Sequence, residues 1–288
     1  MLKHYRAVFF DWDGTAVLSR QAPAKEAADA MRPLLEEGIR LVIVSGTTIE
    51  NIAGGRIGDF FTEKQLSGLY LGLGRGAYNY RFRGKEPELF ADCLPDGETL
   101  EKIHRVCFEI HMELKRVYDF DTDIVFSRPN YCKIDLMAAC ERGEQLFMQE
   151  GELLRLKDSL RVHGIDGGLK SLMETAVRIG REYGIRVVPT CDAKYLEVGI
   201  SSKSDNVDTI LARLTEECGI RPEECAYWGD EYVGIEPGIF GSDSFMRTEL
   251  TKAGAFFDVS DVPGVRPDGV QHVGGGVPRF LEFLRGEG

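Results

Sequence analysis

The sequence lacks the features that would place it in several large classes of protein. Its five histidines show no metal-binding spacing. Its seven cysteines are an odd number without a Cys-x-x-Cys pair, so neither a disulfide framework nor a zinc ribbon is indicated. No segment approaches the ~18 apolar residues of a membrane-spanning helix. We therefore expect reduced thiols, no zinc site and no membrane partner.

Positive charge is also scarce. There are 35 lysine and arginine residues against 47 aspartate and glutamate residues, which gives a formal net charge of −12 at pH 7. Binding to nucleic acid depends on clustered basic side chains, so nucleic acid is not an expected partner. A small anionic substrate remains compatible, because it responds to local charge. The polar residues 3–6 lead directly into an apolar strand without the apolar stretch of a signal peptide, so we expect a cytoplasmic protein.

Apolar strands alternate with amphipathic helices near both ends of the chain, a pattern typical of an α/β fold with a mainly parallel sheet. The predicted strands are residues 5–10, 41–44, 69–71, 225–228 and 254–257. The predicted helices are residues 22–37, a segment that follows Ser45, a segment from about residue 204, and a terminal helix after the glycines at 274–276.

The pattern changes in the middle of the chain, where a long helix at 98–117 is followed by paired strands at 124–126 and 131–136. Helical patterns near 144–160 and 169–183 and short strands at 185–188 and 194–198 follow. This order predicts an α+β domain over residues 83–198. It interrupts a core made of residues 1–82 and 199–288.

Two aspartates, Asp11 and Asp13, follow the first predicted strand and precede Gly14 and Thr15. In open α/β sheets the carboxyl end of a strand is where ligands bind. Asp11 can attack phosphorus as a nucleophile while Asp13 transfers the proton of the leaving group. Gly14 lets backbone N–H groups approach a phosphate. The pattern therefore predicts phosphoryl transfer at this strand end.

Residues 11–15, Asp-Trp-Asp-Gly-Thr, resemble the first signature of the haloacid dehalogenase superfamily, whose members are mostly Mg²⁺-dependent phosphatases that form an aspartyl phosphate. The resemblance implies a Rossmann-like core and further signatures, which occur in order. Ser45 and Gly46, after the second strand, correspond to the groups that hold phosphate oxygens. Lys203, just before a helix, corresponds to the lysine that balances the charge of the nucleophile and the phosphate.

The last signature is an acidic pair, which Asp230 and Asp243 match. The resemblance implies a Mg²⁺ site formed by Asp11, the carbonyl oxygen of Asp13, Asp230 and Asp243. The segment between Asp230 and Asp243 is longer than the family's usual spacing. Either Asp243 or Glu231 therefore completes the predicted site.

The inserted domain falls between the second and third signatures, which resembles the Cof-like, sugar-phosphatase branch with an α/β cap. Arg75, Arg128 and Lys133 lie near where that branch contacts its substrate, so each is either a candidate substrate ligand or a solvated surface charge. We expect a Mg²⁺-dependent phosphomonoester hydrolase that acts on a small phosphorylated metabolite, a sugar or polyol phosphate. A phosphotransferase or phosphomutase using the same aspartyl phosphate, or a slow phosphate-binding regulatory protein, remains an alternative. The sequence leaves the oligomeric state unknown.

Overall fold

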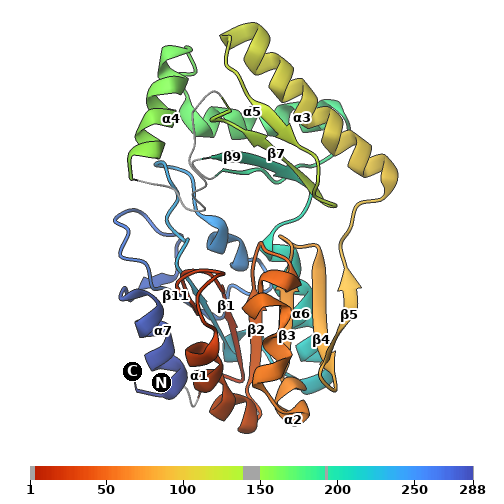
Figure 1. Cartoon of the computed structure of the whole chain (residues 1–288), viewed down its shortest axis with the longest axis vertical. Coiled ribbons are helices and arrows are strands. Elements are labelled where there is room, and N and C mark those ends of the chain that lie inside the picture. The colour runs from red at the N-terminus through yellow and green to blue at the C-terminus, as the bar shows by residue number, and fades with distance from the viewer. Residues whose placement is uncertain (1–3, 139–149, 192–193, 288) are drawn as a thin grey trace. The chain divides into compact units, whose positions relative to one another are not determined.

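The computed structural model describes residues 4–138, 150–191 and 194–287 (Figure 1). The chain divides into two compact units. Unit 1 contains residues 1–93, 202–234 and 240–288, and unit 2 contains residues 94–201 and 235–239. These boundaries differ from the predicted ones, because residues 83–93 belong to unit 1 and residues 199–201 and 235–239 belong to unit 2.

Unit 1 is built on an eight-stranded sheet with the strand order β12-β11-β10-β1-β2-β3-β4-β5. The strands from β12 to β3 are parallel, and the pairs β3–β4 and β4–β5 are antiparallel. The strands are β1 (Ala7–Phe10), β2 (Arg40–Val44), β3 (Leu69–Leu73), β4 (Tyr78–Arg83), β5 (Glu86–Asp92), β10 (Cys225–Gly229), β11 (Ala255–Asp258) and β12 (Val270–His272).

Helices cover both faces of this sheet. Val8 and Phe10 of β1 pack in one apolar cluster with α1 and α7, whereas Ala7 and Phe9 pack in another with α6 (Figure 1). Successive residues of a strand point to opposite faces, so both sets are buried. The helices of unit 1 are α1 (Lys25–Glu36), α2 (Glu63–Leu66), α6 (Lys203–Cys218) and α7 (Gly276–Arg285).

Two local predictions for unit 1 were wrong. The segment after Ser45 does not form one α-helix but three short 3₁₀ helices, η2 (Ile49–Asn51), η3 (Ala53–Gly55) and η4 (Ile57–Phe60). Gly54 and Gly55 have positive φ angles of 64° and 77°, which interrupt a regular helix. The hairpin of β4 and β5 extends the core sheet, although most of its residues lie within the predicted inserted domain.

Unit 2 contains a four-stranded antiparallel sheet in the order β6-β7-β9-β8. Side chains from one face of this sheet share an apolar core with α3, α4 and α5 (Figure 1). The predicted strand at 185–188 is absent, and the strand in this region is β8. The elements are α3 (Gly97–Tyr118), β6 (Asp123–Val125), β7 (Tyr131–Asp135), α4 (Glu150–Val162), α5 (Gly168–Glu182), β8 (Thr190–Cys191) and β9 (Tyr195–Gly199).

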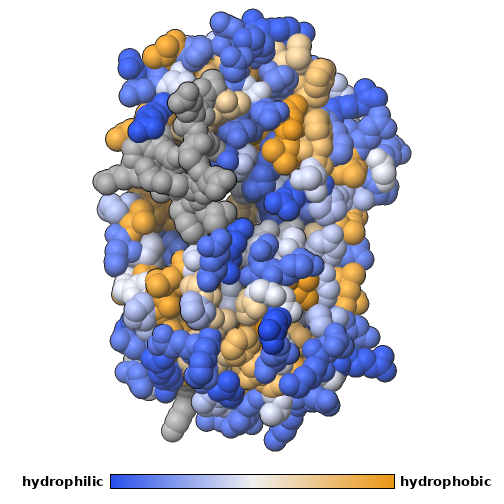
Figure 2. All heavy atoms as spheres, in the orientation of Figure 1, coloured by the Kyte–Doolittle hydropathy of each residue, from blue (hydrophilic) through white to orange (hydrophobic). Residues whose placement is uncertain are grey.

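The surface agrees with the composition. The face in Figure 2 is mostly hydrophilic, with apolar side chains scattered among charged ones. None of the helices in the described ranges combines the length and apolar character that crossing a membrane would require. Six of the cysteines are free thiols, whereas Cys140 and the start of the predicted 144–160 helix lie outside the described residues.

Candidate active site

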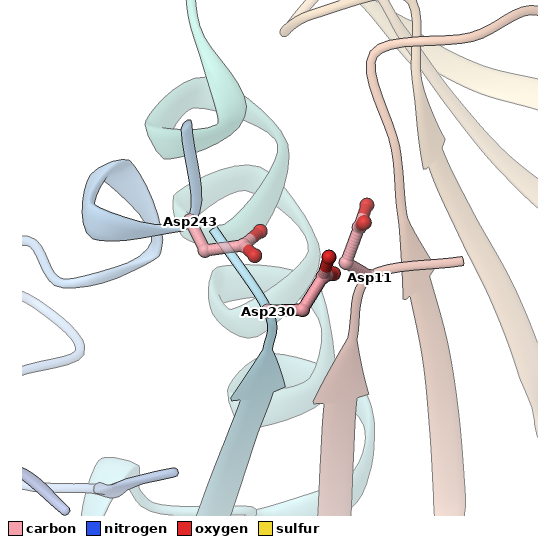
Figure 3. Close-up of side chains that lie close together, drawn as sticks. All are labelled: Asp11, Asp230 and Asp243. Atoms are coloured by element: carbon pink, nitrogen blue, oxygen red, sulfur yellow. The ribbon is translucent and has the colours of Figure 1, made fainter. Parts of the chain in front are cut away.

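Three carboxylates meet at the carboxyl edge of the central parallel strands. Strands β1 and β10 are neighbours, and the Asp11 N–H donates to the Trp228 carbonyl at 2.9 Å. Asp11 and Asp230 directly follow these two strands, whereas Asp243 comes from the short 3₁₀ helix η6 (Ser242–Met246). One oxygen from each carboxylate lies within 4.8 Å of the other two, and the three side chains converge in Figure 3. This is a donor set suited to a hard divalent cation.

Two glycines allow these carboxylates to approach the backbone. A Cβ atom on Gly14 would lie 2.1 Å from Asp230 Oδ2, and the φ angle of +86° at Gly14 is one that L-residues rarely adopt. A Cβ atom on Gly229 would lie 2.3 Å from Asp243 Oδ2. Any side chain at either position would displace a carboxylate. The glycine after Asp13 therefore also makes room for Asp230.

Lys203 is held in the same cluster. Its Nζ donates to Asp11 Oδ1 at 2.9 Å and to Asp243 Oδ1 at 2.7 Å, and the residue is 5% exposed. Lys203 is the first residue of α6, where a capping box formed by Ser202 and Asp205 fixes the start of the helix. The local sequence thus positions an ammonium group between two buried carboxylates, as the resemblance implies.

Negative charge exceeds positive charge in this cluster. Burial raises the pKa of Asp11 well above its usual value, and the nearby carboxylates of Asp243 and Asp230 raise it further although Lys203 lowers it. Burial and the same kind of repulsion raise the pKa of Asp230 to about 8. Burial disfavours the charged form of Lys203, but Asp11 and Asp243 outweigh it and raise its pKa. A bound divalent cation would compensate this excess charge, so the residues present fit a metal ion.

Asp13 lies at the edge of the cluster and has a different environment. Burial raises the pKa of its carboxyl group, while Arg20 and Lys203 act in the opposite direction. Arg20 Nη2 lies 3.8 Å from Asp13 Oδ2. Among the described residues, no group hydrogen-bonds to the buried Asp13 Oδ1. Asp13 therefore has a carboxyl oxygen available for proton transfer.

The residues predicted to hold phosphate follow β2, which is the neighbour of β1 on its other side. Ser45 is 3% exposed, its N–H donates to the Gly72 carbonyl at 2.9 Å, and its Oγ accepts from the Thr47 N–H at 3.3 Å. Gly46 is exposed, and a Cβ atom placed on it would meet no described atom within 4 Å. The structure thus places Ser45 and Gly46 at the same sheet edge as Asp11.

Asp243, rather than Glu231, joins the carboxylate cluster. Asp243 is fully buried and its Oδ2 accepts from the Glu231 N–H at 2.8 Å. The Glu231 side chain is exposed and accepts from Ser242 Oγ at 2.7 Å. The longer spacing between the two aspartates therefore does not prevent Asp243 from reaching the cluster.

The three predicted substrate residues have unlike positions. Arg75 lies in the turn between β3 and β4 of unit 1, within the predicted core, and it is 5% exposed. Arg128 is exposed in the loop between β6 and β7. Lys133 on β7 forms an ion pair with Glu197 at 2.7 Å, and its Nζ lies 4.7 Å from the centre of the Tyr195 ring.

Two contributors to the site were not predicted from the sequence. Thr15 Oγ1 donates to Asp230 Oδ1 at 2.9 Å and is fully buried. Because Thr15 belongs to the first motif, its position indicated a role in the site, but the sequence did not indicate that Asp230 is its hydrogen-bond partner. Arg20, which lies beside Asp13, gave no signal because an arginine in a loop is usually solvated.

No family model and no curated protein sequence matches the chain significantly. Solved structures do match. An IMP-nucleotidase from Plasmodium falciparum is 13% identical with a TM-score of 0.53, covering 78% of this chain and 53% of that one. A trehalose-6-phosphate phosphatase from Aspergillus fumigatus is 15% identical with a TM-score of 0.58, covering 98% and 94%. A protein from Eubacterium rectale is 13% identical with a TM-score of 0.56, covering 98% and 99%.

The chain spans about half the length of the nucleotidase chain and nearly all of the trehalose-6-phosphate phosphatase chain. At sequence identities of 13–15%, these matches show a similarity of fold alone. In this chain the architecture is a mainly parallel α/β core interrupted by an inserted α+β unit, with Asp11 and Asp230 at the carboxyl ends of two neighbouring central strands. The chain therefore shares the fold of these solved structures, a Rossmann-like core with a mainly parallel sheet and an inserted α+β unit.

Proposed function

We propose that the protein is a Mg²⁺-dependent phosphomonoester hydrolase that acts through an aspartyl phosphate on Asp11. The observation that carries this proposal is the cluster in which Asp11, Asp230 and Asp243 meet, with Lys203 bound to Asp11 and Asp243. Such a cluster combines a nucleophile, a cation site and a fixed ammonium group, the parts that phosphoryl transfer requires. The fold that this chain shares with the trehalose-6-phosphate phosphatase supports the same interpretation.

In the first step, an oxygen of Asp11 attacks phosphorus in line with the ester oxygen. A P–O bond forms to Asp11, and the P–O bond to the leaving alcohol breaks. Lys203 holds the Asp11 carboxylate in one orientation and contributes positive charge where the transferred group gains negative charge. Asp13, whose pKa is raised by burial, gives its proton to the leaving oxygen.

In the second step, the deprotonated Asp13 accepts a proton from a water molecule that attacks the aspartyl phosphate. This step releases inorganic phosphate and restores Asp11. Asp11, Asp230 and Asp243 would hold the divalent cation, with the carbonyl oxygen of Asp13 as a further ligand. When bound, Mg²⁺ supplies charge neutralisation for the phosphate oxygens. Ser45 and the N–H groups beside Gly46 would bind the remaining phosphate oxygens.

We propose a small phosphorylated metabolite with a sugar or polyol unit as the substrate. The negative net charge gives no electrostatic attraction for a polyanionic polymer. The names of two structural neighbours, a trehalose-6-phosphate phosphatase and an IMP-nucleotidase, both specify phosphate esters of sugar-containing molecules. The sugar-phosphate assignment for this chain rests on this similarity and on the resemblance in the sequence.

The test is phosphate release from a panel of sugar, polyol and nucleoside monophosphates. We expect turnover with Mg²⁺, none after chelation with EDTA, and background rates for Asp11→Asn. Asp59→Asn is the matched control, because Asp59 on η4 is exposed and forms a surface ion pair with Arg56. Full activity of Asp11→Asn would overturn the mechanism. Transfer of phosphate to a second sugar in place of release would identify a phosphotransferase.

A further inference from the structure

The chain between Asp230 and Asp243 crosses from one unit to the other and returns. Unit 1 includes residues 202–234 and resumes at Phe240, whereas residues 235–239 belong to unit 2. We call residues 231–242 the bridging hairpin. It joins two of the clustered carboxylates through a tip that is packed in the inserted unit. The insertion that lengthens this motif thus adds a covalent connection between the units.

The base of the bridging hairpin is fixed to Asp243. The Glu231 N–H donates to Asp243 Oδ2 at 2.8 Å, and the Asp243 N–H donates to the Glu231 carbonyl at 3.1 Å. The Gly241 N–H donates to the Tyr232 carbonyl at 3.2 Å, and Val233 pairs with Phe240 in an antiparallel bridge. Backbone pairing therefore runs from the carboxylate cluster to the start of the tip.

The tip is anchored in unit 2 by apolar and polar contacts. Ile239 is 7% exposed within the apolar core of unit 2, and Ile235 packs against the same core. Glu236 Oε2 accepts from the Leu169 N–H at 3.1 Å, near the N-terminus of the 15-residue helix α5, where a negative charge is favourable. Lys157 Nζ on α4 donates to the Ile235 carbonyl at 3.2 Å.

We propose that Glu236 and Ile239 are positioning residues for the metal site. Asp243 lies on a five-residue 3₁₀ helix rather than at a strand end, so the sheet does not fix it directly. Its backbone and one carboxylate oxygen are held by the hairpin base, and the hairpin tip is held by unit 2. Anchoring the tip therefore keeps Asp243 in the orientation that completes the cation site with Asp11 and Asp230. Coupling between two sites is reciprocal, so a bound cation also strengthens the attachment of the tip.

The experiment measures Mg²⁺ binding by isothermal titration calorimetry with the full chain. We expect Glu236→Ala and Ile239→Ala to raise the Kd for Mg²⁺ by about fivefold or more, the lower end of typical coupling between sites. The Mg²⁺ concentration that gives half-maximal phosphatase activity should rise by the same factor, whereas kcat at saturating Mg²⁺ is retained. Glu236→Gln keeps an acceptor for the Leu169 N–H and should recover part of the affinity.

Asp96→Ala is the matched control. Asp96 is also a carboxylate in unit 2 that accepts an N–H at a helix N-terminus, from Thr99 at 2.7 Å in α3. It has no part in the hairpin, so its variant should bind Mg²⁺ like the wild type. Circular dichroism identifies any variant that fails to fold. If Ile239→Ala fails to fold, the Mg²⁺ affinities of the Glu236 variants alone test the inference.

The outcomes separate this inference from the proposed function on which its metal site rests. A wild-type protein that binds no Mg²⁺ would overturn the metal site itself and the inference with it. Wild-type binding with unchanged Kd in folded Glu236→Ala and Ile239→Ala would overturn only the inference. The same loss of affinity in Asp96→Ala would also overturn it, because the effect would then reflect general weakening of unit 2.

Discussion

Thr15 Oγ1 donates a hydrogen bond of 2.9 Å to Asp230 Oδ1, which joins the first and last motifs across 215 residues of sequence. The two residues follow neighbouring parallel strands, β1 and β10. Thr15 is fully buried, so its hydroxyl group cannot exchange this partner for water. The threonine of the first motif therefore positions a carboxylate of the last one.

Removing this hydroxyl group should weaken both the fold and the cation site. Thr15→Val keeps the shape but leaves a carboxylate oxygen without its donor, which costs about 1–3 kcal/mol when the group is buried. We expect a lower free energy of unfolding in urea and a higher Kd for Mg²⁺. Thr15→Ser retains a hydroxyl group and should lie closer to the wild type. Equal stability of wild type and Thr15→Val would contradict a role for this bond.

Lys203 should be required for stability as well as for activity. Lys203→Met removes the ammonium group from two buried carboxylates, Asp11 and Asp243, and breaking a buried ion pair from one side costs about 3–5 kcal/mol. We expect a large drop in the melting temperature in EDTA, a smaller drop with Mg²⁺, and no phosphate release.

The control for Lys203 is Lys252→Met, because Lys252 is exposed and forms a surface pair with Glu249. Surface pairs contribute little, so we expect almost no change in melting temperature or activity. If Lys203→Met melts like the wild type in EDTA, the buried ammonium group does not stabilise the cluster.

Stability without metal should fall as the pH rises. Burial and neighbouring carboxylates raise the pKa of Asp230 from 3.8 to about 8, so between these values the folded chain binds more protons than the unfolded chain. The contribution of this group is fully present below its unfolded pKa and is lost as the pH rises through about 8. The slope from one group is at most about 1.4 kcal/mol per pH unit.

Thermal melts in EDTA between pH 5 and pH 8.5 would measure this slope. We expect Mg²⁺ to raise the melting temperature more at pH 8 than at pH 5, because the cation takes the place of the proton. Asp230→Asn carries no titratable group at this position and should flatten the pH dependence. A melting temperature in EDTA that rises between pH 5 and pH 8 would contradict the prediction.

Part of the site could be predicted from the sequence, for a geometric reason. Carboxyl ends of parallel strands lie at one edge of a sheet, so residues that follow β1, β2 and β10 were expected at the same edge, and the family resemblance indicated which of them to combine. Asp11, Ser45 and Asp230 are in this position. Asp243 lies beyond a strand end, and its place in the cluster depends on the hairpin that precedes it.

Other features depend on contacts that no local pattern contains. The β4–β5 hairpin follows a parallel strand, and nothing in its residues indicates that it joins the core sheet rather than the inserted unit. Residues 235–239 belong to unit 2 because Ile239 is buried in its core, and this depends on tertiary contacts rather than on the local sequence. Arg20 approaches Asp13 through the conformation of a loop. Propensity and periodicity do not specify such contacts.

Gly14 offers the sharpest test of how the site is packed. In Gly14→Ala the new methyl group would fall 2.1 Å from Asp230 Oδ2, and the φ angle of +86° would be strained as well. We expect Mg²⁺ affinity and phosphate release to be lost, with a free energy of unfolding lower by at least about 1 kcal/mol from the backbone alone. Gly97→Ala is the control, because Gly97 has no positive φ angle and its Cβ atom would meet no described atom within 4 Å. It lies in the first turn of α3, where alanine favours the helix, so this variant should be at least as stable as the wild type. Normal Mg²⁺ binding by Gly14→Ala would show that Asp230 can move and still bind the cation, and the close packing of the first and last motifs would then not be needed for the metal site.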